Sequence, residues 1–126
     1  MQAFITTYNL IPSKKTVIIT FIKLLPQSDK RQAMIDILKS MQAWTRTKPD
    51  CICCSLYEQA NDTHAVLYVE QWQTKEAFDR HVQSSMYMRL LTAIEFGSDT
   101  PDIQFHEVSQ TSGMEMIEAL RSGSSG

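Results

Sequence analysis

Hydrophobic residues along the chain follow two different periods, and the change between them predicts where strands give way to helices. Residues 16–25, TVIITFIKLL, are almost continuously apolar, which predicts a strand that is buried on both faces. From about residue 29 to residue 47 the apolar positions recur at helical spacing, at Met34, Ile37, Leu38, Met41 and Trp44. Pro26 ends the strand and Pro49 stops the helix, because proline disfavours helix at the residue before it.

The second half of the chain has two predicted strands before its helical segment. Residues 51–58 and 65–72 are separated by turn-forming residues, so they predict a hairpin. Thr74 then stands where a helix cap belongs, and Glu76 suits the positive end of a helix. His81 falls on the inner, apolar stripe of that helix. Residues 102–108, DIQFHEV, predict a last strand.

The order strand, helix, strand, strand, helix, strand is typical of the ferredoxin-like split βαβ arrangement. The predicted fold class is therefore α+β, with one antiparallel four-stranded sheet and both helices on one face. The other face also carries apolar side chains and needs a cover. We expect Leu67 and Val69 to face the helices, and Tyr68, Glu70 and Trp72 to face a partly polar cavity on the opposite side.

The 126 residues are enough for one domain with a substantial core. We divide the chain into an N-terminal arm at 1–15, a single domain at 16–110, and a C-terminal short helix with a flexible tail at 111–126. The net charge of −2 predicts no basic surface, so we expect no nucleic-acid partner. No apolar run approaches the roughly 20 residues of a membrane span, and no signal peptide is visible, so we expect no membrane partner.

The three cysteines, Cys51, Cys53 and Cys54, lie within one short segment. Their number is odd and they contain no C-x-x-C pair, which favours reduced thiols in a cytoplasmic protein over a metal site or a disulfide. Regular strand alternation would place Cys51 and Cys53 on one face and Cys54 on the other.

Five side chains are candidates for a functional site. His81 could act as a general base or hydrogen-bond donor, or it could pack under the sheet as a structural residue. Trp72 and Tyr68 could form flat walls for a planar ligand, or fill the core. Glu70 needs a partner, which could be a backbone amide, Arg80 or Arg89, or it could itself be a base. Tyr57, on the preceding strand, completes the expected substrate-binding set with Tyr68, Glu70 and Trp72.

The order of residue types over residues 50–91 also carries a family resemblance. It runs Tyr68-Val69-Glu70-Gln71-Trp72, then Glu76-Ala77-Phe78, then His81, then Ser84-Ser85-Met86-Tyr87. This order resembles the antibiotic biosynthesis monooxygenase-like domain family. The resemblance implies a dimeric α/β barrel, in which the sheets of two subunits pack face to face as a homodimer.

The same resemblance implies a cofactor-independent monooxygenase, which oxidises a quinol, an anthrone or a similar aromatic small molecule with O₂. In that case His81, Trp72 and Tyr68 would be the catalytic residues, and no metal or cofactor would be needed. A different class remains open: a non-catalytic small-molecule-binding protein or an isomerase on the same fold. Haem degradation, which related proteins of this fold carry out, fits less well. Those proteins have a Trp on the second helix, and in this chain the position that resembles it is occupied by His81.

Overall fold

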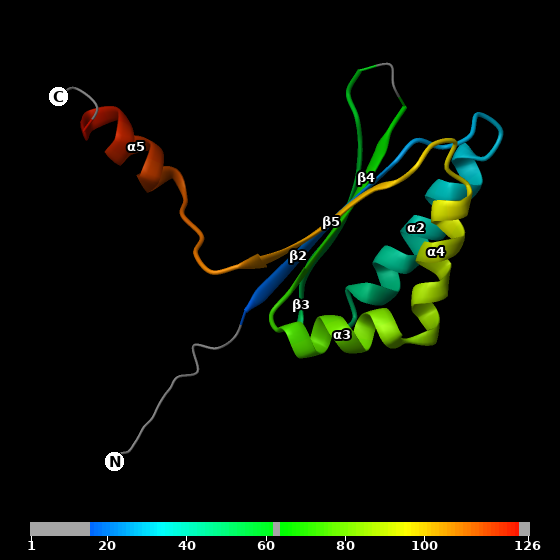
Figure 1. The fold of residues 1–126 in the computed structure, drawn as a ribbon, viewed down its shortest axis with the longest axis horizontal. Coiled ribbons are helices and arrows are strands. Elements are labelled where there is room, and N and C mark those ends of the chain that lie inside the picture. Colours follow the sequence, from blue (N-terminus) through cyan, green and yellow to red (C-terminus); the bar gives the residue numbers. More distant parts are fainter. Residues whose placement is uncertain (1–15, 62–63, 124–126) are drawn as a thin grey trace, which may run out of the picture.

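The computed structural model describes residues 16–61 and 64–123, whose strands and helices follow the predicted order (Figure 1). The strands are β2 (Val17–Leu24), β3 (Cys51–Glu58), β4 (Val66–Trp72) and β5 (Asp102–Val108). The helices are α2 (Arg31–Thr45), α3 (Lys75–Gln83), α4 (Met88–Glu95) and α5 (Met114–Gly123), with a short 3₁₀ turn, η2 (Ser85–Tyr87), before α4. The predicted N-terminal arm lies outside the described residues.

The four strands form one antiparallel sheet in the order β3-β4-β2-β5. Helices α2, α3 and α4 lie on one side of this sheet, as Figure 1 shows. This is the ferredoxin-like α+β fold that the sequence predicts. The predicted second helix is divided into α3 and α4, because Ser84 adopts an extended backbone and its hydroxyl donates a 2.7 Å hydrogen bond to the carbonyl of His81.

The main core lies between the sheet and helices α2 and α4, and Leu38, Met41 and Leu90 are fully buried there. A smaller cluster of Ile18, Trp72 and Ala77 continues this core under α3. Strand β2 contributes Ile18 and Ile22 to these clusters, whereas Ile19 and Phe21, on its other face, are only half-buried. The prediction that β2 is buried on both faces is therefore wrong for the described residues of a single chain.

The predicted orientation of β4 is wrong. Tyr68, Glu70 and Trp72 face the helices and are no more than 2% exposed. They pair directly with Ile22, Thr20 and Ile18 of β2, and directly paired residues of antiparallel strands share a face. Both faces of β4 carry apolar side chains. The alternation in the sequence therefore shows which residues share a face, but not which of the two faces meets the helices.

A β-bulge reverses the side-chain alternation at the start of β3. Cys51 pairs with Trp72 and Cys53 with the adjacent Gln71, so Ile52 is an extra residue in the ladder. As a result Cys51 and Cys54 both pack against the core clusters, and Cys53 does not. The expectation that Cys51 and Cys53 share a face is therefore wrong.

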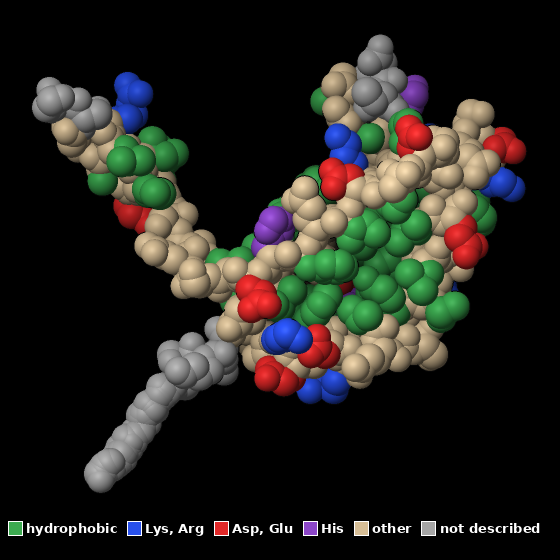
Figure 2. Space-filling view, viewed as in Figure 1, with side chains coloured by type: hydrophobic (Ala, Val, Ile, Leu, Met, Phe, Trp, Pro, Cys, Tyr) green, Lys and Arg blue, Asp and Glu red, His purple; other side chains and the backbone are tan. Residues whose placement is uncertain are grey.

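The described residues of the single chain leave two apolar surfaces uncovered. Figure 2 shows hydrophobic side chains gathered on the helix side, over the region bordered by β5, α3 and α4. The exposed hydrophobic residues of those elements are Val82, Met88, Leu91, Ile103 and Phe105. The second surface, which we call the open face, is the side of the sheet away from α2, α3 and α4, and its apolar residues are Ile19, Phe21, Tyr57, Leu67 and Val69.

Helix α5 extends away from the rest of the chain (Figure 1) and exposes Met114, Met116, Ile117 and Leu120. Among the described residues, no helix combines the length and the hydropathy that crossing a lipid bilayer would require.

Candidate active site

Glu70 lies at the centre of the site, in the middle of β4, and is 1% exposed. A buried carboxylate is costly unless its oxygens accept hydrogen bonds. Trp72 donates its indole Nε1–H to Glu70 Oε1 at 2.9 Å, and His81 Nε2 lies 2.9 Å from Glu70 Oε2. The structure therefore brings together three of the predicted residues, and it replaces the expected arginine partners of Glu70 with an indole and an imidazole.

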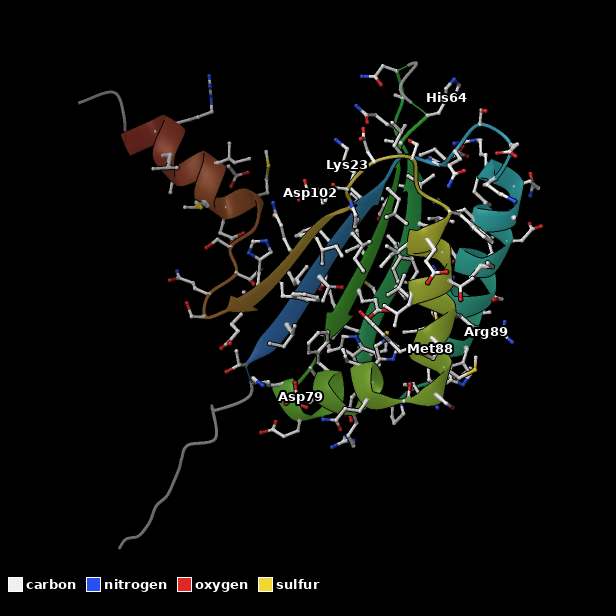
Figure 3. All side chains as sticks on the ribbon, turned by 45° about the vertical axis from the view of Figure 1, so that its right-hand side comes forward. Lys23, His64, Asp79, Met88, Arg89 and Asp102 are labelled. Carbon is white, nitrogen blue, oxygen red and sulfur yellow. The ribbon has the colours of Figure 1, made fainter. Side chains whose placement is uncertain are left out.

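Neither arginine considered from the sequence reaches Glu70. Arg80 lies 3.6 Å from the carboxylate of Asp50, and Arg89 donates a 3.0 Å hydrogen bond to the hydroxyl of Ser40. Figure 3 shows Arg89 and Asp79 directed away from the space between the sheet and the helices. The partners of Glu70 thus come from its own strand and from the next helix.

The short connection from β4 to α3 sets the position of His81. The hydroxyl of Thr74 accepts a 3.1 Å hydrogen bond from the backbone N–H of Ala77, which caps the helix at its start. Ala77 and His81 are four residues apart, so they lie on the same side of α3, and both are buried against the sheet. Glu70 and Trp72 share a face because they are two residues apart on a strand, where successive side chains point to opposite faces.

The hydrogen bonds assign the proton of His81. The indole nitrogen can only donate, and a carboxylate only accepts, so the neutral imidazole carries its proton on Nε2. Nδ1 then keeps its lone pair. This atom is buried and has no hydrogen-bond partner within the described residues. A ligand hydroxyl or an acidic C–H placed beside Nδ1 would meet an acceptor held ready for it.

Aromatic rings surround the His81 imidazole on several sides. Ring centroids lie 4.5 Å away for Trp72, 5.2 Å for Tyr87 and 5.8 Å for Trp44, with Trp44 stacked at 23°. These contacts restrict the rotation of the imidazole and keep water from its faces. From the sequence, Trp44 is expected only in the core stripe of the first helix, and Tyr87 only in the family motif and an apolar stripe. Neither residue is expected beside His81, because periodicity does not relate it to that position.

A cavity of about 270 Å³ opens beside this cluster. Its inner wall is formed by Trp44, Trp72 and His81, and charged residues lie at its edge: Lys48, Asp50 and Arg80. Pro49, Ala77 and Ser84 complete the lining. The cavity therefore offers flat apolar walls and a charged rim, and the unpartnered Nδ1 of His81 is buried in the residue that forms part of its wall.

Tyr68 and Tyr57 lie outside this cavity. Tyr68 is fully buried in the main core, where the Cys54 thiol donates a 3.1 Å hydrogen bond to its hydroxyl. Burial, followed by the negative charge of Glu70, raises the pKa of Tyr68 far above its usual value, so the phenol stays protonated. Tyr57 is 55% exposed on the open face of the sheet. The structure does not place either tyrosine beside His81.

Burial is expected to slow the reaction of the thiols that lie next to the site. Burial, then the charge of Glu70, raises the pKa of Cys51 to about 11, and burial raises that of Cys54 to about 12. Because the thiolate is the nucleophile, we expect Cys51 and Cys54 to be alkylated slowly by iodoacetamide near neutral pH. The alkylation rate of Cys51 should keep rising with pH until about 11, beyond the ordinary value of 9.0.

Peptide mass spectrometry after timed alkylation of the native protein measures these rates. The urea-unfolded chain is the control, and there all three thiols should react alike. A Cys51 rate that levels off near pH 9 in the native protein would contradict the assigned environment.

The cluster and most of the fold fall within residues 17–91, which match the family described as antibiotic biosynthesis monooxygenase. This match covers more than half of the chain. The chain belongs to the antibiotic biosynthesis monooxygenase family. Its matched segment begins with β2 and ends within α4, so β5 and α5 lie beyond it.

One curated protein and several solved structures are similar to this chain. It is 29% identical over 82 residues to the uncharacterized protein sll1783 of Synechocystis, an alignment that covers 65% of this chain and 50% of that protein. The chain thus spans about half the length of that relative. Rv0793 of Mycobacterium tuberculosis superposes with a TM-score of 0.69 at 21% identity, over 77% of this chain and 99% of that one. A conserved protein of Methanosarcina mazei gives a TM-score of 0.67 at 18% identity, over 75% and 95%. At these identities the structural likeness shows the fold alone.

Proposed function

We propose that this chain is a cofactor-independent monooxygenase that oxidises a quinol, an anthrone or a similar hydroxylated aromatic molecule with O₂. Membership of the monooxygenase family supports the class of reaction. The observation that carries the proposal is the buried Nδ1 of His81, which has no hydrogen-bond partner within the described residues. The other ring nitrogen lies 2.9 Å from the Glu70 carboxylate, and His81 lines an aromatic cavity.

The reaction balances without an external reductant. For an anthrone, Nδ1 of His81 removes a proton from the acidic CH₂ carbon. The resulting carbanion gives an electron to O₂, and the two radicals combine to form a C–O bond and a peroxide anion. The proton returns to the peroxide, and loss of the second hydrogen from carbon breaks the O–O bond and releases water. The CH₂ group becomes C=O, so one oxygen atom enters the product and the other leaves as water.

Each residue of the cluster has a defined part in this scheme. Glu70 holds the Nε2–H tautomer and stabilises the imidazolium that forms when Nδ1 accepts the proton. Trp72 fixes the carboxylate through its indole N–H. Trp44 and Trp72 supply flat walls against which a planar ring can pack. The apolar surroundings keep the substrate anion away from bulk water.

We also propose that two copies associate through the open face of the sheet as a homodimer. The residues that support this are Ile19, Phe21, Leu67 and Val69, which lie together on the two central strands, and none of the described helices lies over them. A contiguous apolar face of this kind is typical of an interface. The three free cysteines support a reducing compartment, and we place the protein in the cytoplasm as part of this proposal.

Oxygen uptake with a panel of quinols and anthrones tests the proposed activity. We expect the wild-type protein to consume O₂ faster than the buffer control with at least one member, and His81→Ala to fall to the control rate. Gln83→Ala, the same change at an exposed residue of α3 that does not line the cavity, is the matched control and should keep the wild-type rate. Uptake equal to the buffer control with every compound would rule out the enzyme function and leave a binding protein.

A further inference from the structure

We propose that the rim of the cavity binds an anionic substituent through Lys48, so that the ligand is a small hydroxylated aromatic acid. That such an acid is the substrate rests on the proposed function, whereas that it binds here rests on the cavity alone. Within the described residues, the Lys48 ammonium has no carboxylate partner and Nδ1 of His81 has no hydrogen-bond donor. One ligand of this class would supply both an anion and a donor.

The first group is the ammonium of Lys48. It lies 4.2 Å from the centroid of the Trp44 ring and lines the cavity. No carboxylate forms an ion pair with it within the described residues, whereas the cations Arg80 and Lys75 each have an aspartate partner. Lys48 is also held in place, because its backbone N–H bonds to Thr45 and its carbonyl accepts from Cys51. The rim therefore presents a positioned positive charge that lacks a counter-ion.

The second group is Nδ1 of His81, a buried acceptor without a donor in the described part of the chain. Both groups contact the same indole: Trp44 stacks on the His81 imidazole and also lies under the Lys48 ammonium. A ligand that packs against Trp44 can thus place a hydroxyl at His81 and an anion at Lys48.

Charge decides which end of the ligand points inward. Glu70 lies directly behind the His81 ring, so its negative charge opposes an anion at the floor of the cavity. Glu70 itself does not line the cavity, and the carboxylate that does, Asp50, lies 3.6 Å from Arg80, which leaves Lys48 as the excess positive charge of the rim. The hydroxyl is therefore directed inward and the carboxylate outward. The volume of about 270 Å³ suits a ligand smaller than a typical drug molecule.

The two tryptophans of the sequence, Trp44 and Trp72, both line this cavity, so their indole N–H signals report on its occupation directly. We would titrate the nitrogen-labelled protein with para-hydroxybenzoate and with its uncharged analogue para-hydroxybenzamide, following both signals in proton–nitrogen correlation spectra. We expect the acid to shift the indole signals and to bind about tenfold more tightly than the amide, because a charge-assisted contact to the ammonium of Lys48 is stronger than a contact between neutral groups.

Lys48→Gln should remove this preference by weakening the acid about tenfold while leaving the affinity for the amide unchanged. Lys39→Gln, the same change at an exposed residue of α2 outside the cavity, should leave both affinities as in the wild type. In the free variants, a Trp72 indole signal at its wild-type position shows that the fold is kept, because this N–H donates to the buried Glu70 carboxylate. The Trp44 signal is expected to move in Lys48→Gln, because the ammonium lies over that ring.

Equal affinities for acid and amide in the wild type would overturn the inference, as would a preference that survives in Lys48→Gln. Neither result bears on oxygen uptake with uncharged quinols, so the proposed oxidation can stand while this inference fails. Conversely, an acid preference that depends on Lys48 supports the inference even if no compound is oxidised.

Discussion

Replacing Glu70 with glutamine is expected to lower kcat for quinol or anthrone oxidation by about 10²–10⁴-fold, the usual contribution of general base catalysis. The side chain keeps its shape, so its amide oxygen can still accept from Trp72 Nε1. Its amide nitrogen, however, donates toward His81 Nε2 and forces the imidazole proton onto Nδ1. The atom that should accept the substrate proton is then already protonated.

Two measurements separate this effect from unfolding. Oxygen uptake gives the rate, and the NMR signals of the His81 ring nitrogens show which one carries the proton. Glu76→Gln, an exposed carboxylate on α3, is the matched control and should change neither. A Glu70→Gln protein that retains the wild-type rate with the proton moved to Nδ1 would show that His81 is not the base.

Replacing Phe21 with aspartate is expected to convert the proposed homodimer to a monomer. Phe21 lies on the central strand β2, pairs with Val69 and Gln104, and sits in the middle of the open face. Burying an unpaired carboxylate in an apolar interface costs several kcal/mol, so the dissociation constant should rise by about a hundredfold or more.

Sedimentation velocity over a range of micromolar concentrations measures this change. Phe105→Asp is the matched control, because Phe105 is 55% exposed on the neighbouring strand but shares its face with Thr20 on the helix side. We expect that variant to remain dimeric. A wild-type protein that sediments as a monomer throughout would refute the dimer before either variant is made.

The arrangement of the strands and helices could be predicted because it depends on local signals. The apolar periods locate β2 and α2, Pro26 and Pro49 mark their ends, and Thr74 caps α3 as expected. The direction of β4 could not be predicted in the same way. Val66, Leu67, Tyr68 and Val69 make both faces apolar, so only the pairing with β2 and the packing of the helices decide which face is covered.

The site could be predicted only in part. Its residues Glu70, Trp72 and His81 were each recognisable as candidates, yet their mutual hydrogen bonds depend on how α3 folds back over β4. Trp44 and Lys48 could not be assigned, because they reach the cavity from the end of α2, far from His81 in the sequence. A lysine next to a proline in a turn carries no signal that distinguishes a ligand contact from an ordinary solvated charge.

The extra residue at Ile52 separates the rim of the cavity from the rest of the sheet. Residues Lys48 and Asp50 precede this bulge, whereas the long ladder between β3 and β4 follows it. The rim is joined to the end of β4 instead, through the Cys51–Trp72 pair and the hydrogen bond from the backbone N–H of Gln73 to the carbonyl of Asp50. The register of the ladder beyond the bulge is therefore independent of the ligand-facing edge, and laboratory evolution of new ligand preference is best directed to residues 46–50.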